Sequence, residues 1–422
     1  MNQGELASLL AKVKNDGSET LDLSREELEY LPPGIGDLFN LVELDLTGNR
    51  LAELPSEIGN LTNLTRLNAR NNQLTKLPSE LGGLVNLKGL FLQENQLTEL
   101  PLEVGQLANL VRLNCSNNKL IGLPPEIGHL TSLAWLYLAD NAITELPSEF
   151  GGLSALTDCY LQGNKLGSLP SEIGNLTNLT ELQLDRNELI ELPSGIGGLT
   201  NLNVIYLREN NLADLPSQIA GLTNLTWLYL GGNNLAELPR EIGSMKRLQG
   251  LYIENNQLGK LPQEIGNLTN LIWLYLEGNR LTGLPFSIEK LTHLIQLNLR
   301  NNELTDLSLE MCSLSALVFL DLAFNKISSL PPEIGNLTAL NELHLNDNQL
   351  RELPLEIGDL DEMIDLFLSN NRLIKVPETL GKMNNLERLY LSDNLLTELP
   401  GELDGLVSQD IVLLDGNPLK SS

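Results

Sequence analysis

The sequence predicts an α/β fold, a right-handed solenoid whose short parallel strands line the concave side of the coil. Three observations lead to this prediction. An asparagine recurs every 23 residues, without slippage, from Asn49 to Asn417. Leucines recur at fixed positions around each asparagine, and a proline follows six residues later in nearly every copy. A period of this length is typical of solenoids, in which each coil buries its apolar face only against its neighbours.

The repeating unit reads LxxLxLxxNxLxxLPxxIGxLxN, and residues 41–63, LVELDLTGNRLAELPSEIGNLTN, are a clean copy. Side chains alternate along a strand, so the leucines at positions 4 and 6 point into the core. Positions 3, 5 and 7 therefore face outward on the concave side. In this copy Leu44 and Leu46 point inward, and Glu43, Asp45 and Thr47 point outward.

The asparagine at position 9 stands where the chain leaves the strand. Its amide has both donor and acceptor groups, so it can satisfy turn backbone that the neighbouring coils bury. The repetition predicts an asparagine ladder along the solenoid. The first copy carries Glu26 instead, in a coil where solvent can replace the missing neighbour.

The convex side is predicted to be irregular or to form short helices. Proline at position 15 fixes φ and prevents a long helix, and glycine at position 19, as in Gly59, is expected to permit the next bend. One copy departs from this pattern. It has Ser308 in place of proline and reads LSLEMCSL, so a short helix is expected there.

Residues 1–17 are expected to form an N-terminal capping helix, because Leu6, Leu9, Leu10 and Val13 have helical spacing and a stop at Gly17 follows. Residues 18–422 are expected to form one domain of 18 repeats, the last truncated. The final strand, residues 411–414, is apolar on both faces. An exposed edge of this kind invites pairing, which predicts a weak homodimer through the C-terminal edge.

The repeat resembles the leucine-rich-repeat superfamily, and specifically its 23-residue class with a proline after the fifth core leucine. That class is typical of intracellular Ras-group repeat proteins of the Scribble and Erbin type, and of the repeat regions of Roco GTPases. The resemblance covers residues 18–422. It implies a protein-interaction scaffold or adaptor, with a role in small-GTPase signalling, and an alternative is the regulatory repeat region of a larger Roco-type GTPase or kinase.

Composition and motifs exclude several functions. A net charge of −28 repels nucleic acid and anionic membranes, and no apolar run is long enough to span a bilayer. The three histidines lie in different repeats without metal-ligand spacing, and no phosphate-binding loop occurs. The sequence therefore predicts a protein that is not an enzyme and carries no metal or cofactor. Three cysteines at unrelated spacings indicate free thiols and a cytoplasmic location.

Aromatic residues concentrate at the outward strand positions 3 and 5. Of the 18 aromatic residues 13 occupy these two positions, including every tryptophan. Exposed Trp and Tyr dominate interface hot spots, so we expect a protein partner to bind this face. The candidate contact residues are Phe91, Trp135, Tyr137, Tyr160, Tyr206, Arg208, Trp227, Tyr229, Tyr252, Trp273, Tyr275 and Phe319.

Two alternatives remain for this face. The rings could only stabilise the sheet, since aromatic pairs suit neighbouring strands, or they could stack on carbohydrate. Nearer the N-terminus, Arg66, Arg70 and Arg112 form a basic patch that could receive an acidic segment. Equally, these arginines could only balance Glu43 and Glu94.

Overall fold

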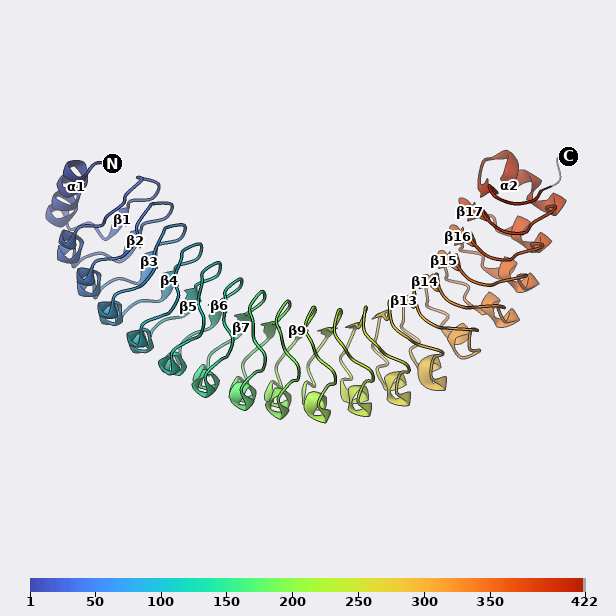
Figure 1. The fold of residues 1–422 in the computed structure, drawn as a ribbon, viewed down its shortest axis with the longest axis horizontal. Helices are drawn as coiled ribbons and strands as arrows, with labels where there is room; N and C mark the ends of the chain where they lie inside the picture. Colours follow the sequence, from blue (N-terminus) through green and yellow to red (C-terminus); the bar gives the residue numbers. More distant parts are fainter. Residues whose placement is uncertain (420–422) are drawn as a thin grey trace. The chain divides into compact units, whose positions relative to one another are not determined.

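The computed structural model describes residues 1–419 and contains two compact units, each presented here by itself. Unit 1 is Met1–Asn211, and unit 2 begins at Leu212. In each unit, short strands follow one side of the coils and short helical segments follow the opposite side (Figure 1). The predicted α/β solenoid with parallel strands is confirmed.

Unit 1 begins with helix α1 (Gln3–Asp16). Its strands are β1 (Thr20–Asp22), β2 (Glu43–Asp45), β3 (Arg66–Asn68), β4 (Gly89–Phe91), β5 (Arg112–Asn114), β6 (Trp135–Tyr137), β7 (Asp158–Tyr160), β8 (Glu181–Gln183) and β9 (Val204–Tyr206). Its 3-10 helices are η1 (Pro33–Asp37), η2 (Ser56–Asn60), η3 (Ser79–Gly83), η4 (Leu102–Gln106), η5 (Pro125–His129), η6 (Ser148–Gly152), η7 (Ser171–Asn175) and η8 (Ser194–Gly198).

Unit 2 continues the same alternation. Its strands are β10 (Trp227–Tyr229), β11 (Gly250–Tyr252), β12 (Trp273–Tyr275), β13 (Gln296–Asn298), β14 (Phe319–Asp321), β15 (Glu342–His344), β16 (Asp365–Phe367), β17 (Arg388–Tyr390) and β18 (Val412–Leu413). Its helices are η9 (Ser217–Gly221), η10 (Arg240–Ser244), η11 (Gln263–Asn267), η12 (Phe286–Lys290), η13 (Met311–Ser313), η14 (Pro332–Asn336), η15 (Leu355–Asp359), η16 (Glu378–Lys382), η17 (Gly401–Leu403) and α2 (Asp404–Ser408).

Helix α1 is capped at both ends. The Asn2 side chain accepts a hydrogen bond from the Glu5 backbone N–H and the Glu5 carboxylate accepts one from the Asn2 N–H, which together form a capping box. Gly17 closes the helix in the left-handed conformation, with φ of 64°. The helix buries Leu6, Leu10 and Val13.

The three-residue strands are formed by repeat positions 3 to 5, and within each unit every strand pairs with the next in parallel, one residue to one residue. In unit 1, for example, Arg66 is opposite Gly89, and Leu67 is opposite Leu90. The residue at position 4 is buried in every strand of three residues, and its two neighbours face outward. This alternation carries the leucines into the core and leaves positions 3 and 5 on what we call the strand face.

The predicted asparagine ladder is present in both units. The Asn72 side-chain amide donates to the carbonyl of Leu46 in the preceding repeat at 2.9 Å and to that of Ala69 in its own repeat at 3.1 Å. Its Oδ1 atom accepts from the Leu51 N–H at 3.1 Å. Each asparagine thus joins two coils by satisfying backbone groups that burial removes from water.

The residue before the ladder asparagine adopts a left-handed conformation in most repeats, a feature absent from the predictions above. Examples are Asn71 with φ of 54°, Asn255 with φ of 55° and Gly278 with φ of 68°. Glycine, asparagine and aspartate tolerate this conformation, and they dominate the position. Phe324, with φ of 56°, is a bulky exception.

The convex segments are short 3-10 helices that begin directly after the position-15 proline. Pro55, for example, is extended, with φ of −68° and ψ of 150°, and helix η2 follows it. The copy with Ser308 in place of proline was expected to gain a short helix, but its helix η13 has three residues, fewer than the five of most copies that keep the proline. Here the residue before the helix, Glu310, is itself in the right-handed helical region.

The glycine at position 19 has a different role from the one expected. Gly59 does not have positive φ, so it is not needed for a bend. A Cβ atom there would lie 2.2 Å from the carbonyl oxygen of Glu80 in the next repeat, and one at Gly266 would lie 2.2 Å from that of Ser287. Glycine is required at these two positions because the consecutive convex segments approach too closely there for a side chain.

Candidate binding surface on the strand face

Eleven of the twelve candidate residues lie on the strand face, at positions 3 and 5, and Arg208 lies two residues after β9, at position 7. In β6, Leu136 is fully buried, and Trp135 and Tyr137 on either side of it are half-buried. The same pattern holds in β10 and β12, each of which also carries a Trp-x-Tyr pair. The structure divides these residues between the two units: Phe91 to Arg208 lie in unit 1, and Trp227 to Phe319 lie in unit 2.

Unit 2 brings five of the candidates together in one stack, which we call the aromatic cluster. The rings of Tyr229 and Tyr252 are stacked with centroids 4.6 Å apart, and those of Tyr252 and Tyr275 are 4.9 Å apart. The Trp227 and Trp273 rings lie 5.1 Å apart. Separations of this size are those of favourable aromatic pairs.

Gly250 explains how the two tryptophans meet. Trp227, Gly250 and Trp273 are aligned at position 3 of adjacent strands, so one strand separates the two tryptophans. A Cβ atom on Gly250 would lie 2.4 Å from the Trp227 ring and 2.9 Å from the Tyr252 ring. The ring of Trp227 therefore lies over the glycine and reaches Trp273 across it.

The tryptophans are less exposed than their outward repeat positions predict. We expected Trp135, Trp227 and Trp273 to be surface-exposed, but all three are half-buried. Neighbouring rings and, at Trp135, an arginine cover one side of each ring. A Trp-to-Ala change on this face therefore removes packing as well as a contact surface.

A second aromatic run continues through the later strands of unit 2. The His344 ring stacks on Phe367 at 4.1 Å and lies 5.6 Å from Phe319, and Phe367 stacks on Tyr390 at 4.5 Å. His344 Nε2 also lies 2.7 Å from a carboxylate oxygen of Glu342. Sequence reasoning placed only Phe319 in the site, although His344 occupies the same repeat position as Phe367 and Tyr390.

In unit 1 the candidates are less continuous. Tyr137 and Tyr160 stack at 4.8 Å with an interplanar angle of 4°, whereas Phe91 and Trp135 each pack against an arginine. Tyr206 lies half-buried in β9. The backbone N–H of Arg208 donates to Asp185 Oδ1 at 2.7 Å; burial raises the pKa of that carboxyl, and this hydrogen bond opposes the rise.

Three tyrosines on this face, Tyr137, Tyr160 and Tyr275, have a raised phenol pKa and stay protonated at neutral pH. Burial raises the pKa of Tyr137, and the charge of Asp158 adds to the effect. Burial likewise raises the pKa of Tyr160 and of Tyr275, the latter with a contribution from Glu254. These hydroxyls can donate hydrogen bonds, as Tyr275 does to Gln296, and they are poor nucleophiles.

A hollow of about 490 Å³ lies on the strand face of unit 1, over β3 to β6. Its lining includes Arg66, Arg70, Arg112, Phe91 and Trp135. We call it the arginine hollow. It corresponds to the basic patch that the sequence indicated.

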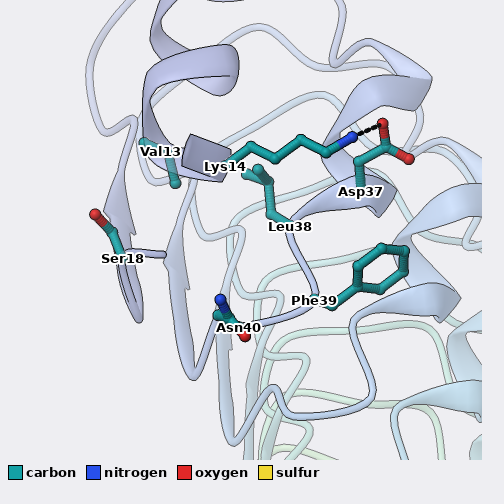
Figure 2. Close-up of a pocket in the computed structure, with 7 residues that line it drawn as sticks. All are labelled: Val13, Lys14, Ser18, Asp37, Leu38, Phe39 and Asn40. Atoms are coloured by element: carbon teal, nitrogen blue, oxygen red, sulfur yellow. Dashed lines mark hydrogen bonds and ion pairs between the residues drawn. The ribbon is translucent and has the colours of Figure 1, made fainter. Parts of the chain in front are cut away.

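A smaller hollow of about 230 Å³ lies between α1 and η1. Figure 2 shows the Lys14 side chain extended past Leu38 to Asp37, with its ammonium 2.8 Å from a carboxylate oxygen. Phe39, beside this hollow, is 56% exposed. Because Asp37 already pairs with the cation, we assign no ligand to this hollow.

In the part of the chain that the structure describes, the cysteine thiols and the metal-ligating side chains form no reactive site. The thiols of Cys115, Cys159 and Cys312 are free and buried, and burial raises their pKa, to about 12 for Cys115 and to about 11 for Cys312. Among residues 1–419, no group of three or more His, Cys, Asp or Glu side chains could hold a metal ion. None of the helices there is long and apolar enough to cross a membrane.

Family models match several segments of the chain. The leucine-rich repeat region model matches residues 227–310 and 302–406, and the leucine rich repeat models match residues 108–166 and 177–235 and, separately, 40–61 and 63–84. No curated protein sequence matches the chain.

Solved structures give broader coverage. A leucine-rich-repeat protein of Leptospira interrogans is 37% identical, with 96% of this chain and 98% of that chain covered and a TM-score of 0.76. YopM of Yersinia enterocolitica is 26% identical over 100% of this chain and 92% of its own, with a TM-score of 0.62. The plant peptide hormone receptor RGFR1, solved in complex with RGF2, is 27% identical over 95% of this chain and 78% of its own, with a TM-score of 0.62.

Proteins with these repeats generally mediate protein–protein interactions, and the repeat domains themselves are typically non-catalytic. The Leptospira interrogans protein matches this chain over nearly the whole length of both, at an identity that a shared fold alone does not require. With 23-residue repeats, parallel strands and an asparagine ladder in both units, the chain belongs to the leucine-rich-repeat family.

Proposed function

We propose that this protein is a non-enzymatic interaction scaffold that binds a protein partner on its strand face, the face predicted to be concave. The observation that carries the proposal is the aromatic cluster of unit 2. Its five rings, Trp227, Tyr229, Tyr252, Trp273 and Tyr275, remain half-exposed on a rigid sheet. Because the rings hold one another in place, little side-chain freedom is lost when a partner binds.

The geometry favours a protein over a carbohydrate. Sugar rings bind to the open faces of aromatic side chains, but stacking at 4.6 to 5.1 Å leaves much of each face covered by its neighbour. The edges and hydroxyls that remain suit the mixed apolar and polar surface of a protein. The peptide hormone complex of RGFR1 provides an analogy for a peptide partner.

Charges beside the aromatic cluster and in unit 1 have mixed sign, as expected of a surface that orients a protein. Arg300 lies 3.9 Å from Glu277 in unit 2, and Arg186 lies 3.4 Å from Asp140 in unit 1. Both pairs are partly exposed, so their charges can act on an approaching partner. We extend the proposal, on the resemblance to Ras-group repeats, to an adaptor role in intracellular signal transduction.

A cytoplasmic location and a weak homodimer are further parts of the proposal. The three buried free thiols suit a reducing compartment. The dimer would form at strand β18, where Leu413 is 44% exposed. Sedimentation at high concentration tests the dimer, and a strict monomer would exclude it.

The central test is affinity capture from a source-cell lysate, read by mass spectrometry. The bait is the wild type, a Trp227→Ala/Trp273→Ala variant, or a Phe286→Ala variant as the matched control. Phe286 is 71% exposed and lies on the convex helix η12, so this control removes an aromatic ring away from the strand face.

The expected result is a partner protein captured by the wild type and by Phe286→Ala but lost from the double variant. Because the tryptophans are half-buried, circular dichroism must show that the double variant remains folded. Equal capture by all three baits would mean that the cluster only stabilises the sheet.

A further inference from the structure

The arginine hollow of unit 1 has a glycine between its two flanking arginines. Arg66, Gly89, Arg112 and Trp135 are aligned at position 3 of the strands β3 to β6. Neighbouring strands are about 4.8 Å apart, so the two arginine backbones stand about 10 Å apart. The edge of the Phe91 ring lies over the glycine between them, 2.9 Å from where a Cβ atom would stand. The hollow therefore has an arginine on each side of the glycine.

Each of the two guanidinium groups packs on an aromatic ring. Arg66 Cζ lies 4.4 Å from the centroid of the Phe91 ring, and Arg112 Cζ lies 4.4 Å from that of the Trp135 ring. This arrangement covers one face of the guanidinium and leaves the N–H groups on its edge free to donate. The aromatic rings thus hold the two cations in place.

These two arginines differ from Arg70 in whether a carboxylate neutralises their charge. Arg70 pairs with Glu94 at 3.1 Å, which is the charge balance that the sequence left open as an alternative. Among residues 1–419, neither Arg66 nor Arg112 has a carboxylate within ion-pair distance, although Glu43 is directly beside Arg66 on β2. Their charge is therefore available to an external partner.

Polar groups around the arginines suit a peptide. Asn114 Oδ1 accepts from the Ser116 N–H at 3.0 Å, so the amide nitrogen is the group that Asn114 presents as a donor. Thr47 Oγ1 and Gln93 Oε1 are buried atoms of the lining without a hydrogen-bond partner among residues 1–419. A hydroxyl and an amide oxygen are complementary to the C=O and N–H groups of a peptide backbone.

The charge around the hollow limits the length of an anionic ligand. The net charge of the chain is −28, and Asp22, Glu43 and Asp45 extend along the strand face on the N-terminal side, with Asp158 and Glu181 on the other. A long polyanion such as a nucleic acid would meet these carboxylates on both sides. A short acidic segment would not, and a hollow of about 490 Å³ is of the size that typically holds a compact ligand.

We propose that the arginine hollow binds a short acidic peptide segment of a protein partner, whose Asp or Glu carboxylates pair with Arg66 and Arg112. This inference rests on the proposed function, because it assigns a partner chemistry to the unit 1 part of the strand face. The segment's carboxylates form charge-assisted hydrogen bonds with the guanidinium edges. Its backbone reaches Asn114 and Gln93.

The test measures fluorescence polarisation of a labelled short oligoglutamate peptide with the full chain, beside an oligoglutamine peptide and an oligonucleotide of equal length. The Arg66→Ala/Arg112→Ala variant removes both cations. The Arg280→Ala/Arg351→Ala variant changes the net charge equally at two exposed arginines of unit 2. An Arg66→Lys/Arg112→Lys variant keeps the charge and removes the planar guanidinium group with its paired N–H donors.

Oligoglutamate is expected to bind the wild type and the unit 2 control equally, and more weakly as salt rises. In the double alanine variant its Kd should increase about tenfold or more, with a smaller increase in the lysine variant. If the alanine variant fails to fold by circular dichroism, the lysine variant alone decides. Equal binding of oligoglutamine, tighter binding of the oligonucleotide, or an unchanged Kd in the variants that fold would overturn the proposal.

The same assay separates this proposal from the proposed function. The Trp227→Ala/Trp273→Ala variant should keep its oligoglutamate affinity, because the aromatic cluster belongs to unit 2. If that variant loses its captured partner while oligoglutamate fails to bind the wild type, only the arginine hollow has been assigned wrongly. If oligoglutamate binds but capture is equal for all baits, the role of the aromatic cluster fails and the arginine hollow stands.

Discussion

The two units place different side chains on either side of a glycine at equivalent strand positions. In unit 1 the row at position 3 reads Arg66, Gly89, Arg112, and in unit 2 it reads Trp227, Gly250, Trp273. In unit 2 the tryptophans lean together over the glycine and meet at 5.1 Å. In unit 1 the two cations pack on aromatic rings instead, and a hollow of about 490 Å³ remains.

This comparison shows that one scaffold can present opposite surfaces. Backbone geometry, register and the central glycine are shared, so they do not explain the difference. It arises because two tryptophans attract each other by stacking, whereas two guanidinium groups repel each other by charge unless an anion lies between them. Unit 2 therefore has a closed apolar cluster, and unit 1 has an open cationic cleft.

The prediction with the largest expected effect tests whether the two units share the same scaffold. Asn72→Ala in unit 1 and Asn256→Ala in unit 2 should each lower the free energy of unfolding by about 3 kcal/mol. Each change leaves several buried backbone groups without a partner, at ~1–3 kcal/mol for each such group. Asn256 donates to the carbonyls of Leu230 and Ile253 and accepts from the Leu235 N–H.

Urea unfolding followed by circular dichroism measures both variants. Asn234→Ala is the control, because this asparagine is exposed and accepts only a hydrogen bond from Gln257 among the contacts described. The control should change the unfolding free energy by less than about 0.5 kcal/mol. If the Asn72 and Asn256 variants differ by more than the control does, the two units do not share one scaffold.

The next effect concerns the central glycines. Gly250→Ala should cost about 2 kcal/mol, within the range for overpacking, because the new Cβ atom would lie 2.4 Å from the Trp227 ring. Gly89→Ala should cost less, since its Cβ atom meets only the edge of the Phe91 ring, at 2.9 Å. Gly259→Ala, with no atom within 4 Å, is the neutral control.

Thermal unfolding ranks these three variants by stability. Near-ultraviolet circular dichroism reports on the packing of the tryptophans. Gly250→Ala should also reduce the near-ultraviolet signal, because Trp227 must move away from Trp273. An equal cost at Gly89 and Gly250 would show that the tryptophan stack contributes nothing at this position.

A smaller effect follows from exchanging the side chains themselves. In an Arg66→Trp/Arg112→Trp variant, the two new rings should lean over Gly89 as Trp227 and Trp273 lean over Gly250. The hollow would close, and oligoglutamate affinity should fall about tenfold, as for loss of the charges alone. If the near-ultraviolet signal stays unchanged, the two new tryptophans do not stack. The residues around position 3, and not the position 3 residues themselves, would then decide the packing.

The smallest effect compares buried thiols of the two units. Burial raises the pKa to about 12 for Cys115 in unit 1 and to about 11 for Cys312 in unit 2. Only the thiolate reacts, so at a given pH below both pKa values a larger fraction of Cys312 than of Cys115 is thiolate. A thiol reagent, applied at increasing pH and mapped by mass spectrometry, should label Cys312 first. Labelling of Cys115 first would show that unit 1 opens more easily.

The sequence predicted the scaffold well because every repeat must meet the same two local requirements: it must bury its leucines and satisfy its turn backbone. Leu44 and its equivalents are buried because strand side chains alternate, and Asn49 and its equivalents bind backbone because each coil leaves turn groups unsatisfied. Those requirements lie within one coil and its neighbour, so they recur every 23 residues in the printed sequence. The left-handed residue before the ladder asparagine was missed, although glycine, asparagine and aspartate at that position signalled it.

The sequence alone thus determined the fold, the core and the residues that line the strand face. The tertiary structure decided what that face presents. Trp227 meets Trp273, which is 46 residues away, across Gly250, and Arg70 is paired while Arg66 is held on Phe91. Such choices depend on the direction in which long side chains lean across several strands, and that direction is set by packing and charge among all the neighbours together.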